Sequence, residues 1–122
     1  MNVKIDTKEK MHVITINEVN IAANMTEKMG KLFTLLLDEN VKNAVVSMKD
    51  IKMVDNAAAL YILGLQQLFN EHQASFVVCH LQPQVRKFFD EADLLDQLNF
   101  TLTESEAMDI VQMEELEREM GL

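Results

Sequence analysis

The sequence is poor in the residues on which several classes of protein depend. Its single cysteine, Cys79, cannot form an internal disulfide, which points to a reducing compartment. Its three glycines do not form a Gly-rich phosphate-binding loop. The longest apolar run, residues 57–65, is interrupted by Gly64 and is too short to span a bilayer. Because the chain also opens without a basic segment followed by an apolar one, we expect no signal peptide and a cytoplasmic protein.

Basic residues are scarce as well. Twenty Asp and Glu against eleven Lys and Arg give a net charge of −9, which disfavours binding to nucleic acid and to anionic membranes. The excess is local, because residues 103–122 carry seven acidic residues against Arg118 alone, a net charge of −6. The acidity therefore belongs to a predicted C-terminal helix. We expect neither a nucleic-acid partner nor insertion into a membrane.

Residues that could carry catalysis or bind a metal are few. A metal site needs three or four convergent ligands, and no ligand-like spacing links the three histidines, His12, His72 and His80. Cys79 lies inside an apolar run, which is typical of a buried, inert thiol. We expect no enzymatic activity, no metal and no cofactor.

Apolar residues recur every three or four positions in four segments, which predicts four helices. These cover about residues 25–38, 57–71, 83–92 and 103–122. Asn24 followed by Glu27 has the spacing of a capping box and predicts that Asn24 caps the first helix. Either Asp55 or Asn56 can cap the second helix, and Pro83 suits the first position of the third.

Strands are predicted where apolar and polar residues alternate or where short apolar runs occur. The expected strands are residues 3–7 and 12–16, which form a hairpin, residues 44–48 and 75–79, which are buried, and residues 99–101 at an edge. Strands and helices in this order predict an α/β fold. We expect a single domain of residues 1–122, with a mixed sheet of four to five strands, an N-terminal β-hairpin and about four helices.

Residues 45–64 are the most informative segment, because a buried strand leads through a short loop into an unusual helix. Residues 57–65 are apolar nearly all round, whereas a surface helix normally shows an apolar stripe of about 100°. Either this helix is buried on most sides, or part of its outer face meets a partner. The sequence leaves both interpretations open.

The same segment resembles the STAS domain of bacterial anti-sigma-factor antagonists. In that family a buried strand leads to a loop reading Asp-Ser-Ser-Gly or Asp-Ser/Thr-x-Gly, which opens an apolar helix; here the loop reads Asp55-Asn56-Ala57-Ala58. Three later stretches are also similar to the family, namely residues 75–89, 93–100 and 103–107. The resemblance implies a STAS fold over nearly the whole chain.

In that family, the first Ser or Thr after the Asp is phosphorylated by a partner kinase that is also the anti-sigma factor. Asn56 occupies that position and has no hydroxyl group. The resemblance therefore implies a loop that is not phosphorylated at Asn56 and stays like the unphosphorylated, binding-competent form. A preference for Asn at a helix cap could also account for this residue.

The resemblance implies a non-enzymatic regulatory module that binds a GHKL-type kinase/anti-sigma factor or another regulatory protein. The residues expected to bind the partner are Asp55, Asn56, Ala57, Ala58, Tyr61 and Asn24. A second hypothesis is an accessory subunit or scaffold of a larger assembly, such as a lipid ABC transporter or a stressosome-like complex. A third is a nucleotide or small-ligand sensor, which the missing phosphate-binding loop disfavours.

The acidic C-terminal helix carries Met113, Leu116 and Met120 at intervals of three and four residues. Such a stripe could form a contact with a second helix, so the sequence allows a homodimer. A run of barely two heptads seldom suffices alone, so packing of this helix against the body is the favoured interpretation.

Overall fold

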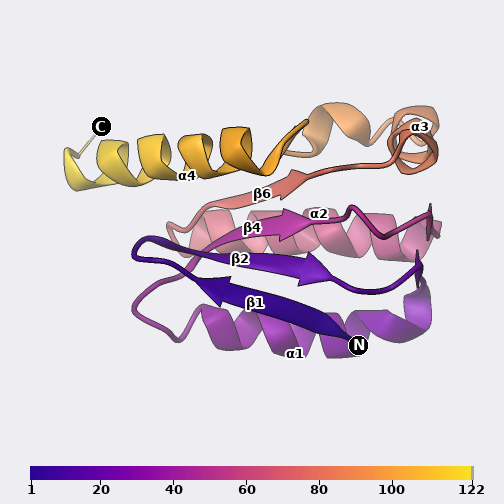
Figure 1. Cartoon of the computed structure of the whole chain (residues 1–122), viewed down its shortest axis with the longest axis horizontal. Helices are drawn as coiled ribbons and strands as arrows, with labels where there is room; N and C mark the ends of the chain where they lie inside the picture. The colour runs from indigo at the N-terminus through magenta and orange to yellow at the C-terminus, as the bar shows by residue number, and fades with distance from the viewer. Residues whose placement is uncertain (122) are drawn as a thin grey trace.

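The computed structural model describes residues 1–121, in which three strands precede the first helix and further strands and helices then follow one another along the chain (Figure 1). The strands are β1 (Val3–Thr7), β2 (Met11–Ile16), β3 (Asn20–Ile21), β4 (Asn43–Ser47), β5 (Met53–Val54), β6 (Phe76–Cys79) and β7 (Phe100–Thr101). The α-helices are α1 (Thr26–Leu36), α2 (Asn56–Glu71), α3 (Pro83–Glu91) and α4 (Glu104–Glu119), and two 3-10 turns are η1 (Ala23–Met25) and η2 (Leu95–Gln97).

Five of these strands form one mixed sheet in the order β1-β2-β4-β6-β7. The antiparallel hairpin of β1 and β2 is closed by the Lys8 N–H, which donates to the Met11 carbonyl at 2.8 Å, while β2, β4, β6 and β7 run parallel. Strands β3 and β5 form a separate parallel ribbon. Sequence patterns missed this ribbon because two-residue strands are too short to show alternation. The α/β class, the hairpin and the four helices are confirmed over residues 1–121.

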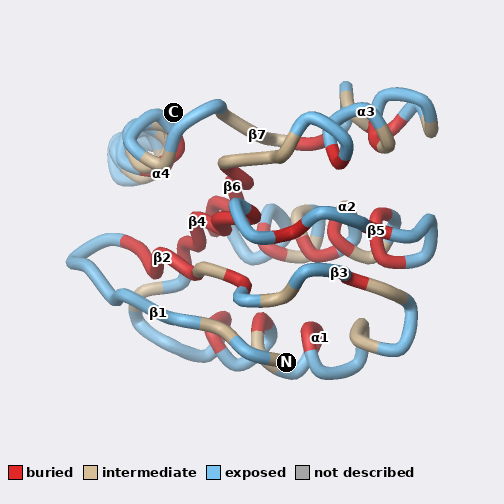
Figure 2. Tube along the Cα trace, turned by 45° about the vertical axis from the view of Figure 1, so that its right-hand side comes forward, coloured by how far each residue is buried: buried red, intermediate tan, exposed pale blue. Residues whose placement is uncertain are grey.

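Helices cover both faces of the sheet. One apolar cluster includes Ile14, Val46 and Val78 and packs against α1 and α2; the other includes their neighbours Val13, Val45 and Val77 and packs against α4. Successive side chains of a strand point to opposite faces, so this division follows from the pleat. Strands β4 and β6 are buried at every residue for the same reason, as Figure 2 shows.

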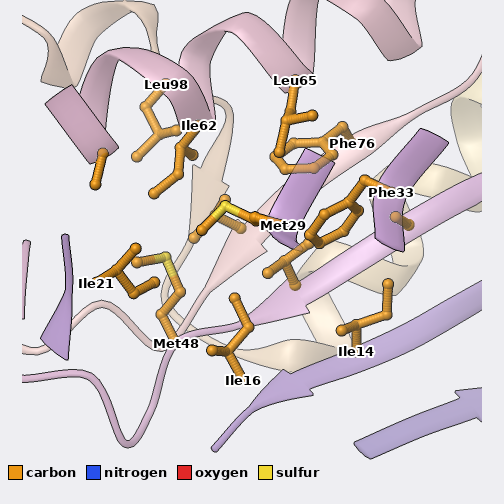
Figure 3. Packing of buried hydrophobic residues seen from close by; sticks show 14 of the residues in the cluster. Ile14, Ile16, Ile21, Met29, Phe33, Met48, Ile62, Leu65, Phe76 and Leu98 are labelled. Atoms are coloured by element: carbon orange, nitrogen blue, oxygen red, sulfur yellow. The ribbon is translucent and has the colours of Figure 1, made fainter. Parts of the chain in front are cut away.

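Three phenylalanines fill the larger cluster between α1, α2 and the sheet. Phe33, Phe69 and Phe76 meet edge to face, with ring centroids 5.2–6.1 Å apart. Figure 3 shows Phe33 and Phe76 among the aliphatic and methionine side chains of the same cluster. Phe33 lies on the apolar face of α1, Phe69 on that of α2 and Phe76 on the strand β6 that both helices cover, so the three rings meet in the layer between the helices and the sheet.

A glycine allows close contact between α1 and α2. Gly30 is buried in α1, and a Cβ atom at this position would collide with the Tyr61 hydroxyl oxygen and lie 3.2 Å from Tyr61 Cζ. Tyr61 on α2 therefore packs over Gly30. A larger side chain would have to displace the tyrosine ring.

Candidate functional site

Asp55 joins the start of α2 to the segment that precedes α1. Parallel pairing of β3 with β5 brings the two segments together, and the Asp55 N–H donates to the Ile21 carbonyl at 3.1 Å. Asp55 Oδ1 accepts a hydrogen bond from the Ala58 N–H at 2.8 Å, and Oδ2 accepts one from the Ala23 N–H at 2.9 Å. These bonds from Ala58 and Ala23 lower the pKa of the Asp55 carboxyl group below its ordinary value of 3.8.

Asp55, and not Asn56, is the cap of α2. Asn56 is the first helical residue, and its side chain is exposed. The alternative interpretation of Asn56 as a helix cap is therefore wrong. Ala57 is also exposed, whereas Ala58 is fully buried and contributes its N–H to Asp55. The loop exposes Asp55, Asn56 and Ala57 to solvent, and the Asp55 carboxylate also accepts the two backbone hydrogen bonds.

The prediction that Asn24 caps the first helix is also wrong. Asn24 lies in the middle of η1, and the cap position of α1 is taken by Met25, which makes no side-chain capping bond. The reason is that the chain has already turned into a 3-10 helix before α1 begins, so Asn24 no longer has the extended backbone that a cap requires. Its side chain is exposed and follows Ala23 directly, which places it beside the residue that binds Asp55.

Helix α2 is buried on one side and exposed on the other. Ala58, Ala59, Ile62, Leu65 and Phe69 are buried. Leu60, one turn after Asn56 and on the same helix face, is 51% exposed. Tyr61, expected at the docking surface, is partly buried against the core and covers Gly30. Burial therefore explains most of the apolar residues of α2, but not Leu60.

Two further exposed apolar residues lie beside the Asp55 loop, and sequence reasoning missed both. Val19 is 55% and Met53 66% exposed, and the Val19 carbonyl accepts hydrogen bonds from the backbone N–H groups of Lys52 and Met53. A shallow hollow of about 250 Å³ adjoins them, lined by Asn20, Ile21, Ala22, Met53, Val54 and Asp55. Only tertiary pairing of β3 with β5 brings these segments together, so no spacing in the sequence could have indicated it.

Two residues whose side chains could take part in catalysis or bind a metal, His12 and Cys79, are buried in the interior of the fold. His12 is buried, with Nδ1 2.9 Å from Thr7 Oγ1 and Nε2 2.8 Å from the Val41 carbonyl. Cys79 lies under α4, and burial raises the pKa of its thiol to about 11. Within residues 1–121, no group of three His, Cys, Asp or Glu side chains is placed to hold a metal ion. No helix in that range is both long and apolar enough to cross a bilayer.

Comparison with known proteins agrees with this architecture. The family model for the STAS domain matches residues 2–107, so the chain belongs to the STAS family. A candidate anti-sigma factor antagonist from Thermotoga maritima shares the fold with a TM-score of 0.79 and 14% identity, over 90% of this chain and 94% of that one. The anti-sigma factor antagonist SpoIIAA in its unphosphorylated form gives a TM-score of 0.70 and 18% identity, over 91% of this chain and 96% of that one.

The same fold also occurs as part of a much larger protein. The murine anion transporter Slc26a9 matches with a TM-score of 0.71 and 12% identity, over 85% of this chain but only 18% of the transporter. At these identities the likeness concerns the fold. The predicted STAS fold is thus confirmed, and its members include both separate antagonists and a transporter domain.

Proposed function

We propose that this chain is a cytoplasmic, non-enzymatic regulatory module that binds a protein partner through the Asp55 loop and the first turns of α2. The observation that carries the proposal is the exposure of Asn56 and Leu60 on one face of α2. Exposed Met53 and Val19 adjoin the same loop. Apolar anchors beside a small polar group are a composition typical of protein interfaces.

The internal bonds of Asp55 support a binding role for the loop that is independent of phosphorylation. Both carboxylate oxygens are engaged by backbone N–H groups, so the loop is held in one conformation without a phosphate group. A phosphate at the first residue of α2 would add about −1.5 to −2 charge at pH 7. Asn56 keeps this position neutral. The proposed partner is a GHKL-type kinase/anti-sigma factor or another regulatory protein, bound constitutively.

The test uses the purified chain as bait in an extract of its native cell, with bound proteins identified by mass spectrometry and then measured by calorimetry. Asn56→Asp should weaken binding of the recovered partner, because it places a charge in the contact. An acidic residue in the first turn is favourable to a helix, so lost stability would not explain a weaker complex.

Asn70→Asp provides the matched control. Asn70 is exposed on the same helix, fourteen residues or about 21 Å further along, and it undergoes the same chemical change. It should leave the affinity unchanged. Equal affinities for wild type and Asn56→Asp would show that the Asp55 loop is not the contact.

A second candidate function is that of an accessory subunit or scaffold in a larger assembly, such as a lipid ABC transporter or a stressosome-like complex. The observation in its favour is the shared fold with a domain of Slc26a9, in which the STAS-like part is a small fraction of the protein. Recovery of transporter subunits with an ABC-type ATPase would support this function. Recovery of a GHKL-type kinase would support the first.

A further inference from the structure

Helix α4 is apolar on two opposite sides. Ala107 and Val111 are fully buried against the sheet. Met113, Leu116 and Met120 are 54%, 55% and 62% exposed. At 100° per residue these three lie within about 40° of the direction opposite to Val111. The outer stripe, defined here as Met113, Leu116 and Met120, therefore points away from the protein.

The C-terminal half of α4 is held so that this stripe cannot turn inward. The Arg118 guanidinium donates to Glu115 Oε2 at 2.8 Å and to Asn43 Oδ1 and Ser75 Oγ at 3.1 Å each. Ser75 Oγ in turn donates to Glu114 Oε1 at 2.6 Å. Asn43 and Ser75 are buried at the amino ends of β4 and β6. These bonds hold the inner side of α4 against the sheet. Figure 2 shows most of α4 in the colour of exposed residues.

The surroundings of the outer stripe are acidic. Glu106, Asp109 and Glu117 lie on the exposed side of α4, on or beside the line of the stripe. Arg118, the basic residue of α4, is already engaged with the inner groups. Lys10 pairs with Glu119 at 3.1 Å. Beside the stripe, a hollow of about 320 Å³ is lined by Lys10, Gln112, Glu115, Leu116 and Glu119.

The negative charge around the outer stripe determines which kind of partner can bind there. A second copy would bring two acidic helices together, and like charges at close range oppose association. An anionic membrane is disfavoured for the same reason. A helix whose apolar residues are flanked by Lys or Arg would match the stripe with its apolar side and the carboxylates with its cations.

We propose that the outer face of α4 docks a basic amphipathic helix of a partner protein. This surface is separate from the Asp55 loop, which lies at the opposite end of the sheet, and the outer stripe lies beyond the matched STAS region, which ends at Ala107. The chain thus offers two protein-binding surfaces. One is the Asp55 loop, and the other is the outer stripe on the C-terminal part of α4.

The test is a titration of the isotope-labelled full chain, followed by NMR, with a synthetic amphipathic helix of about 18 residues, roughly five turns. The probe has Leu at its apolar positions and Lys elsewhere, and a matched probe has Glu in place of Lys. We expect the Lys probe to shift resonances of residues 109–120 and not those of residues 55–63. The Glu probe should not bind.

Variants then separate the stripe from general acidity. Met113→Ser/Leu116→Ser/Met120→Ser should weaken binding at least about tenfold, or about 1.4 kcal/mol. Leu35→Ser is the control, because Leu35 on α1 is 65% exposed, and this variant should bind the Lys probe with unchanged affinity. Asp109→Asn/Glu117→Gln should lower both the affinity and its dependence on salt.

Several outcomes would overturn the proposal. Resonance shifts spread over the whole acidic surface, or equal affinity for the triple Ser variant, would mean that the probe senses charge alone. Absence of binding at low salt would mean that the face is not a docking site for such a helix. A dimer in sedimentation velocity that disappears in the triple Ser variant would assign the face to a second copy instead.

Discussion

Gly30→Ala tests whether α1 and α2 are in the close contact that shapes the Asp55 loop region. In the interior of an ordinary helix, Ala is more favourable than Gly by about 1 kcal/mol. Here the added Cβ atom would collide with the Tyr61 hydroxyl oxygen, and overpacking of this kind costs about 1–3 kcal/mol. We therefore expect a net loss of up to about 2 kcal/mol in the free energy of unfolding, instead of a gain.

Tyr61→Phe removes the atom responsible for the collision. Tyr61 Cζ would still lie 3.2 Å from the new Cβ, so the ring must shift by a few tenths of an ångström. In the Tyr61→Phe background, Gly30→Ala should be neutral or stabilising. The coupling energy of the two changes should therefore be positive and at most about 3 kcal/mol, because it equals the part of the overpacking cost that loss of the hydroxyl group relieves.

Urea unfolding of the four proteins, followed by circular dichroism, gives this coupling energy. Gly64→Ala is the matched control, because a Cβ at Gly64 in α2 meets no atom within 4 Å. It should stabilise the protein by about 1 kcal/mol. If Gly30→Ala stabilises as much as Gly64→Ala does, or if the coupling energy is zero, the contact between Gly30 and Tyr61 does not exist as described.

Two further predictions concern titration and thiol reactivity. Because hydrogen bonds lower the pKa of Asp55, its contribution to stability is complete well above pH 3.8 and is lost as the pH falls through the lower, folded-state pKa. Asp55→Asn should therefore lower stability at pH 7 and flatten the decline of stability below about pH 5. Parallel pH profiles of wild type and Asp55→Asn would refute this. Cys79, with a pKa of about 11, should react with a thiol reagent only after urea unfolding. Val111→Ala should speed labelling in the folded state by loosening α4, and rapid labelling of the wild type would contradict the burial of Cys79.

Helix and strand positions were predictable where several residues carried a regular pattern. The alternation in the hairpin and the apolar runs of β4 and β6 placed those strands to within a residue or two. Pro83 marked the start of α3, as expected from its fixed φ and missing N–H. Local patterns succeed here because they report the burial that the fold imposes on each element.

Caps were less predictable, because the capping residue depends on where the backbone turns. Asn24 and Glu27 have a suitable spacing, but η1 starts the turn before Asn24. At α2, Asp55 and Asn56 were equally suitable as residues. Asp55 is the cap since β5 ends immediately before it, and its second oxygen also binds the Ala23 N–H. That second bond joins segments 32 residues apart, which no local pattern can show.

The sequence by itself determined the fold class, the STAS resemblance and the neutrality of position 56, because these depend on residue types and short-range spacing. Tertiary structure alone decided which of those residues face outward. Pairing of β3 with β5 places Val19 and Met53 beside Asp55, and packing over Gly30 turns Tyr61 toward the core. The Arg118 bonds to Asn43 and Ser75 likewise fix which side of α4 meets the sheet. Exposure results from contacts between distant segments, so it is a property of the folded chain.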